Sequence, residues 1–240
     1  MSFLKDRRKV QEMVTRPLWR RAIKSVFPPI DNIRWINQDD EDFQLDKKRS
    51  VDVTIRFPNE SLLYGQVKSL SYKYSGFRTL TVEYYDDPQT GEKGDWFSLG
   101  SHFYCCGFCT QKLQDKVEKC QRRIRSYEGN IDDYFRRLIE EYGIDCLTVD
   151  QAFDSWIIVN WTELVLKTQR GLIKWRTNKN ESRGKADFKF CKMEDIPRDC
   201  VIGGNYEHGE DLLDNVDLTL DNNMGGGWKA EEEFPQVRLF

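Results

Sequence analysis

The sequence predicts a mixed α/β or α+β fold, in which helices flank a central mixed β-sheet. Apolar residues recur at helical spacing near the N-terminus. They then alternate with polar residues at a period of two over residues 51–57, and they return to helical spacing over residues 113–142. The order of elements along the chain is a helix, a run of strands, further helices and late strands. This order indicates helices that pack on a central sheet around a common core.

The first predicted helix covers residues 4–27. Pro17 should start or kink a turn inside it, because proline has no backbone N–H to donate. The pair Pro28-Pro29 ends the helix. Residues 31–49 are polar and acidic, and we predict a loop or an irregular edge there. The apolar positions that mark the helix are Leu4, Val10, Val14, Leu18, Ile23 and Val26.

A β-hairpin is predicted next. Residues 51–57 alternate between apolar and polar side chains, and Pro58-Asn59-Glu60-Ser61 is turn material. Residues 62–70 supply the partner strand, and residues 79–85 a third strand. Two more strands are expected at 96–99 and 102–109, the second continuously apolar as in a buried central strand.

The second half of the chain mixes helices with short strands. Amphipathic helices are predicted around 113–124 and 131–142. A short helix or helical turn is expected at 161–166, and late strands at 156–159, 172–175 and 186–190. We assign residues 1–200 to one α/β domain and residues 201–240 to an acidic, Gly-rich extension.

Composition is that of a folded chain with a sizeable core, since 39% of the residues are hydrophobic and 13% aromatic. The formal net charge of −3 gives no overall basic signature. No apolar run is long enough to span a membrane, and the first residues lack the core of a signal peptide. The cysteine count is odd, seven, which favours reduced thiols and a cytoplasmic, intracellular protein over a disulfide framework.

Three polar residues stand in the otherwise apolar strands of the hairpin: Asp52, Gln66 and Lys68. Gln66 and Lys68 are two residues apart and share one face. If Phe57 pairs with Ser61, Asp52 lies opposite Gln66 and joins that face. If Phe57 instead pairs with Leu62, Asp52 lies on the other face, because a slip of one residue moves every side chain to the opposite face. The apolar positions favour the first register, which assembles the three residues.

An aspartate, an amide oxygen and a lysine on one face suit a hard divalent cation. Mg²⁺ takes oxygen ligands, and it commonly uses one or two protein groups together with waters and substrate phosphates. A metal also makes a coordinated water more nucleophilic and stabilises charge on phosphate. A neighbouring lysine can orient that water and offset developing negative charge.

Asp52 followed, after thirteen residues, by Gln66-Val67-Lys68 resembles the PD-(D/E)xK nuclease superfamily. Its pattern is an acid on one strand and (Asp/Glu)-x-Lys on the next, behind an N-terminal helix. The resemblance implies a restriction-endonuclease-like core over roughly residues 5–85. It implies that Asp52, the Gln66 side-chain oxygen and the Val67 carbonyl bind the metal. Lys68 would then serve as catalytic base or electrostatic stabiliser, and Glu12 on the first helix would be a further ligand.

The resemblance implies a Mg²⁺- or Mn²⁺-dependent deoxyribonuclease whose partner is DNA. It is also compatible with a homodimer. The D…QxK variant would mark a divergent member, of the kind expected in a phage or bacterium. Glutamine at position 66 removes one negative charge and should weaken the metal site. A catalytically inactive member that binds nucleic acid or a protein is therefore the alternative.

Two further patterns of the sequence, one of basic and aromatic residues and one of cysteines, allow other sites. Basic residues cluster on the first helix, on 112–125 and around 174–185, and Tyr72, Tyr74 and Phe77 could stack on bases, although surface lysines and core aromatics account for them nearly as well. Cys106-Gly-Phe-Cys109 lacks the second cysteine pair of a zinc site. In a strand, Cys105 and Cys106 would also face opposite sides, so buried thiols explain these cysteines better.

Overall fold

The computed structural model describes residues 7–27, 29–36, 50–87, 89–98, 100–124, 127, 131–178 and 186–205. We expect a polar, basic loop at 176–185; its first three residues form a strand, and the rest of that loop and the extension beyond residue 205 lie outside the described residues. Within them the fold is mixed α and β, as predicted. Among the described helices, none combines the length and apolar character that a membrane span requires.

A six-stranded mixed sheet forms the centre of the molecule, with strand order β1-β2-β3-β6-β7-β10. Strands β3 and β6 run parallel, and the other neighbours run antiparallel. Every residue of β6 is buried, as expected of a central strand. The strands are β1 (Asn32–Trp35), β2 (Val53–Arg56), β3 (Leu62–Leu70), β6 (Phe103–Cys109), β7 (Phe153–Asn160) and β10 (Val201–Gly204).

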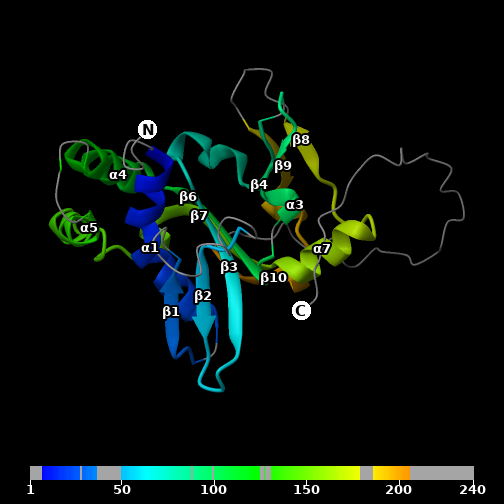
Figure 1. Ribbon diagram of the computed structural model, residues 1–240, viewed down its shortest axis with the longest axis horizontal. Helices are drawn as coiled ribbons and strands as arrows, with labels where there is room; N and C mark the ends of the chain where they lie inside the picture. Colours follow the sequence, from blue (N-terminus) through cyan, green and yellow to red (C-terminus); the bar gives the residue numbers. More distant parts are fainter. Residues whose placement is uncertain are drawn as a thin grey trace, which may run out of the picture.

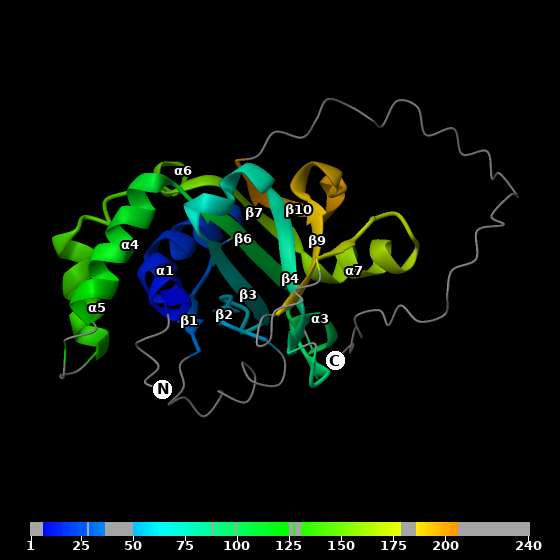
Figure 2. The same ribbon diagram turned by 90° about the horizontal axis from the view of Figure 1, so that it is seen from above.

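Helices cover one face of this sheet, on the left in Figure 1 and in Figure 2. They are α1 (Arg7–Val26), α4 (Gln111–Ile124), α5 (Ile131–Glu141) and the short α6 (Val149–Ala152). Their apolar stripes bury Val14, Leu18, Leu113 and Leu138 against inward-facing residues of the sheet such as Phe153. The helix α1 runs through Pro17, which the sequence placed at a start or a kink.

A second, four-stranded sheet with order β5-β4-β9-β8 lies on the other side (Figure 2). Together with the helix α7 (Trp161–Gln169), it encloses a second apolar cluster that contains Leu80, Val82, Tyr104 and Trp161. Its strands are β4 (Thr79–Asp87), β5 (Glu92–Lys93), β8 (Arg176–Asn178) and β9 (Asp187–Lys192). The 3₁₀ helix η2 (Tyr72–Phe77) leads from β3 into β4, and the 3₁₀ turns η3 (Met193–Asp195) and η4 (Arg198–Cys200) lead from β9 into β10.

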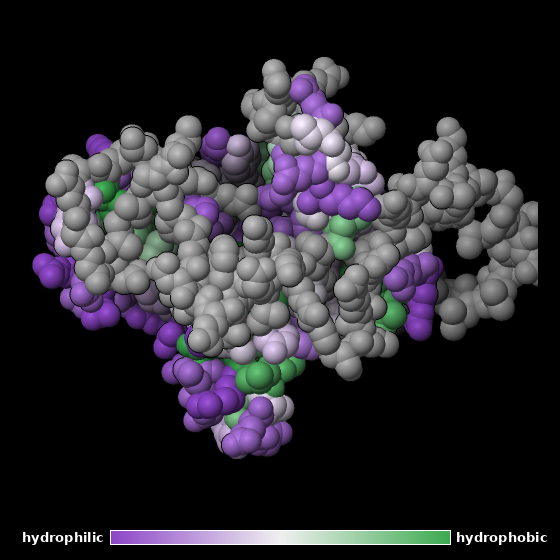
Figure 3. Space-filling view, in the orientation of Figure 1, coloured by the Kyte–Doolittle hydropathy of each residue, from purple (hydrophilic) through white to green (hydrophobic). Residues whose placement is uncertain are grey.

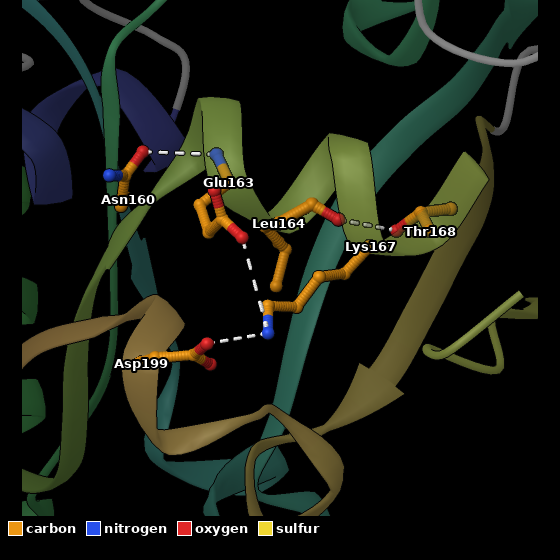
Figure 4. Close-up of polar contacts among 6 residues, drawn as sticks. All are labelled: Asn160, Glu163, Leu164, Lys167, Thr168 and Asp199. Atoms are coloured by element: carbon orange, nitrogen blue, oxygen red, sulfur yellow. Dashed lines mark hydrogen bonds and ion pairs between the residues drawn. The ribbon is translucent and has the colours of Figure 1, made fainter. Parts of the chain in front are cut away.

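Polar contacts stabilise helix α7 near both of its ends (Figure 4). The Asn160 side chain accepts a hydrogen bond from the Glu163 N–H at 3.1 Å and so caps the first turn. Near the other end, the Lys167 ammonium lies 2.5 Å from the Asp199 carboxylate of η4. This contact ties α7 to the turn that precedes β10.

Several local predictions were wrong. Residues 96–99 were expected as a strand, but α3 (Asp95–Ser98) is one helical turn, too short to show helical periodicity in the sequence. A late strand was placed at 172–175, whereas the strand β8 begins at Arg176. Residues 32–35, assigned to a loop or irregular edge, form the edge strand β1. Its four residues gain their order from pairing with β2.

Candidate functional site

The hairpin adopts the register that the apolar positions predict. Val53 pairs with Gly65, and the Phe57 N–H donates to the Ser61 carbonyl at 3.0 Å. The predicted register is confirmed, and Val53 and Ile55 are fully buried on the face toward α1. The pairing ends at Val53–Gly65, and that Asp52, just before β2, joins the face of Gln66 and Lys68 stays a prediction.

The strand β3 continues past the point where its pairing with β2 ends. There, Asp52 and a side chain of α1 form hydrogen bonds with the edge of β3 in place of a neighbouring strand. The Asp52 N–H donates to the Gly65 carbonyl at 2.9 Å, and an oxygen of the Asp52 carboxylate accepts from the Val67 N–H at 2.7 Å. Two residues further on, the Ser69 carbonyl accepts from the Gln11 side chain of α1 at 2.9 Å. Peptide groups of alternate residues turn to the same edge of a strand, so the Val67 carbonyl also points to this side.

The helix α1 is held against this edge by a buried polar network around Ser69. The Ser69 hydroxyl lies 2.8 Å from the Thr15 hydroxyl and accepts from the Trp19 indole N–H at 2.8 Å. Gln11, Thr15 and Trp19 are four residues apart and share one face of the helix. Glu12, the predicted fourth ligand, borders that face, and its place in a metal site stays a prediction.

Gln66 and Lys68 point away from α1, toward the four-stranded sheet. Both are buried, with 7% and 5% of their surface exposed. The Gln66 side-chain oxygen has no hydrogen-bond partner among the residues the structure describes. Leaving such an oxygen buried and unsatisfied costs on the order of 1–3 kcal/mol, so this atom is a natural position for a bound cation or a hydrogen-bond donor from a ligand.

Lys68 forms an ion pair with Glu83, a residue that the sequence did not single out. The Lys68 ammonium lies 3.4 Å from the Glu83 carboxylate, and Glu83 is also buried, at 8% exposure. Burial of two charges is tolerated because they neutralise one another. A glutamate at the polar position of the alternating segment Thr79-Leu-Thr-Val-Glu83 was the available signal. Only the approach of β4 to β3 in space pairs it with Lys68.

A further carboxylate, Asp86, adjoins Glu83. Partial burial, together with the nearby negative charge of Glu83, raises the pKa of Asp86 to about 6. Asp95 and Glu92 add to the effect. Negative charge therefore accumulates beside the buried Lys68, along the β4 strand.

The strand β4 meets the central sheet with its edge. The carbonyl of Thr81 accepts from the Tyr104 hydroxyl at 2.8 Å, and that of Thr79 lies 3.7 Å from the Cys106 sulfur. Both donors belong to β6. The four-stranded sheet consequently presents one face, with Glu83, toward Lys68, and its opposite face toward α7.

The cysteines of β6 behave as buried thiols. Cys105 and Cys106 lie in the two different apolar clusters, on opposite faces of the strand. Burial raises the pKa of the Cys106 thiol to about 12, and the Cys105 pKa is also raised by burial. Thiols with such pKa values stay protonated at neutral pH and do not ligate metal readily.

The donor atoms near Asp52 are all oxygens, the type of ligand that a hard cation such as Mg²⁺ takes. Within the described part of the chain, no group of three or more His, Cys, Asp or Glu side chains is arranged to hold a metal. Asp52 and Gln66 instead offer one carboxylate and one amide oxygen, with the Val67 carbonyl at the same edge. Mg²⁺ sites commonly complete such a partial set with waters and substrate phosphates.

The basic residues of α4 lie elsewhere. Lys112, Lys119 and Arg122 are exposed on its outer side. Figure 3 shows hydrophilic side chains along the left edge of the molecule, at the end where α4 and α5 lie. This helix covers the face of the central sheet opposite to the one that carries Gln66 and Lys68. Any contact of α4 with a polyanion would thus be separate from the candidate site.

Comparison with the models of known protein families, with curated proteins and with solved structures found no match for this chain.

Proposed function

We propose that this protein is a divalent-metal-dependent nuclease that hydrolyses phosphodiester bonds in DNA. The observation that carries the proposal is the edge of β3, where Asp52 accepts from the Val67 N–H at 2.7 Å between two buried residues, Gln66, whose side-chain oxygen has no partner among the described residues, and Lys68. An acid, an amide oxygen and a buried lysine at this edge match the chemistry that phosphodiester hydrolysis needs. The resemblance of Asp52…Gln66-Val67-Lys68 to the PD-(D/E)xK pattern agrees with it.

Asp52, the Gln66 side-chain oxygen and the Val67 carbonyl would hold the cation, and Glu12 would add a carboxylate from α1. When bound, Mg²⁺ supplies Lewis-acid stabilisation of phosphate charge and a more acidic water. The Lys68 ammonium offsets negative charge on the phosphate. Glu83 holds that ammonium in place, and the buried setting strengthens its field because the local dielectric is low.

The test is cleavage of plasmid, linear duplex and single-stranded DNA in Mg²⁺ or Mn²⁺. We expect activity in the wild type, and a loss of at least about 100-fold in Lys68→Ala and Asp52→Asn. Asparagine keeps an oxygen for the Val67 N–H and removes only the charge, so Asp52→Asn separates metal binding from folding. Asp52→Ala should be equally inactive. The proposal fails if these variants cleave at the wild-type rate.

Lys189→Met is the matched control. Lys189 is buried like Lys68, at 7% exposure, but it lies on β9 among Tyr84 and Trp96 and pairs in register with Val82, on the opposite face of the four-stranded sheet. Its replacement also removes a buried ammonium, and it should retain cleavage. Thermal melts of each variant show whether a loss of activity follows from unfolding.

A second candidate is a non-catalytic protein that binds DNA or a protein on the same scaffold. The amide at position 66 and the engagement of Lys68 by Glu83 favour it. Salt-dependent DNA binding without cleavage under any divalent metal would support this candidate. Metal-dependent turnover that is lost in Asp52→Asn would remove it.

A further inference from the structure

A pocket of about 480 Å³ opens beside Lys68. Volumes of this size hold one small ligand. Lys68 forms part of its lining, so the pocket adjoins the candidate site. Its aromatic side chains come from three elements, Tyr74 and Phe77 from η2, Phe188 and Phe190 from β9, and Phe108 from β6.

The aromatic residues form surfaces on which a planar ring could stack. Phe77 is 67% exposed and Tyr74 is 43% exposed, with their ring centroids 6.4 Å apart. Phe188 and Phe190 are two residues apart on β9 and therefore share one face of the sheet. Because neither Phe77 nor Tyr74 is buried in a core, packing within the protein does not explain their presence.

Positive charge surrounds these rings. The Lys68 ammonium lies 5.3 Å from the centre of the Phe188 ring, and the Lys73 ammonium lies 4.5 Å from that of Tyr74. Arg176 pairs in register with Phe190 across β8 and β9 and so shares its face.

Polar groups also reach the pocket. Asn178 pairs with Phe188 in the same register and lines the pocket, as do Thr79 and Thr81, whose hydroxyls lie 3.2 Å apart. Amide and hydroxyl groups can hydrogen-bond the edge of a base, while aromatic faces stack on it.

We infer that this pocket takes up one unpaired nucleobase of a single strand, stacked between η2 and β9. A base inside a duplex is covered on both faces by its neighbours, so only an unpaired or extruded base can enter. Because Lys68 belongs both to the pocket and to the candidate site, a base held here brings its own backbone toward that site. The inference rests on the proposed nuclease function for its ligand class.

Binding of a labelled, short oligothymidine, measured by fluorescence anisotropy in EDTA, tests the pocket without cleavage. We expect tighter binding of the single strand than of a duplex of equal length. Phe77→Ala and Phe188→Ala should weaken it about 5- to 150-fold, the range for losing one base stack. Phe77 is exposed, so its replacement does not threaten the fold.

Two controls sharpen this test. Phe77→Tyr keeps a stacking ring, and Leu172→Ala removes another highly exposed apolar side chain, 62% exposed, that does not line the pocket. Leu172→Ala should bind within about twofold of wild type, as is usual for surface changes away from a site, and Phe77→Tyr should recover most of the affinity that Phe77→Ala loses.

Wild-type affinity in Phe77→Ala and Phe188→Ala would overturn the inference, and so would duplex binding as tight as single-strand binding. If the wild type cleaves no DNA but the two alanine variants still lose affinity, the nuclease proposal fails and the pocket inference stands. If Lys68→Ala abolishes cleavage while Phe77→Ala binds as wild type, the pocket inference alone fails.

Discussion

Replacing Gln66 with glutamate tests the candidate site most directly, because the two side chains have nearly the same shape. Gln66 is 7% exposed, and its oxygen has no partner among the described residues. Asp52 accepts from the N–H of the neighbouring Val67 at 2.7 Å, so the new carboxylate would be buried near a second one. Without metal this should cost about 1–3 kcal/mol or more. For a chain of this length the melting temperature should fall by roughly 2–12 °C.

Magnesium should reverse the loss. The second carboxylate strengthens a cation site, and an ion present at about 100 times its Kd stabilises the folded state by about 2.7 kcal/mol. We therefore expect Gln66→Glu to regain most of its melting temperature in Mg²⁺, with a larger Mg²⁺ response than the wild type shows. The assay is a series of thermal melts at neutral pH, in EDTA and at rising Mg²⁺.

Gln114→Glu is the matched control for this experiment. Gln114 lies on α4, away from Asp52, and is also buried, at 4% exposure. Its side-chain oxygen accepts a hydrogen bond from the Tyr72 N–H at 3.3 Å. Its glutamate variant should lose stability and gain no Mg²⁺ response. A Mg²⁺ response in Gln66→Glu no larger than in Gln114→Glu and the wild type would refute the reasoning that Gln66 faces a cation.

Two further predictions concern stability. Ser69→Ala leaves the buried Trp19 N–H without its acceptor and should cost about 1–3 kcal/mol, a fall of roughly 2–12 °C in thermal melts. Ser155→Ala removes a buried hydroxyl that has no hydrogen-bond partner in the described part of the chain, and it should be nearly neutral. Equal losses in the two variants would contradict this view. Asp86 has a pKa raised to about 6 beside Glu83, so the folded state binds its proton more tightly than the unfolded chain does. Its ionisation therefore removes stability as the pH rises from about 4 through 6. Asp86→Asn should melt higher than the wild type above pH 6, by less than about 1 kcal/mol since the group is partly exposed, and alike near pH 4. A gain that does not change with pH would show that the carboxyl charge is not the cause.

Sequence reasoning reached the hairpin because its two signals are local. The alternation over 51–57 and the turn at Pro58–Ser61 both depend on neighbours in the chain, and together they selected the register found in the structure. Short elements were not predicted correctly, because the single helical turn at 95–98 and the three-residue strand β8 are too short to show periodicity in the sequence. Their conformation depends on the elements they contact.

By itself, the sequence determined the fold class, the hairpin and the shared face of Gln66 and Lys68, since strand periodicity depends only on side-chain order. Tertiary structure decided what that face meets. The edge-on approach of β4 to β6 pairs Lys68 with Glu83, which lies fifteen residues further along the chain. It also sets Phe188 near Lys68, across more than a hundred residues. Contacts between strands of different sheets depend on how the sheets pack, and no local pattern encodes that packing.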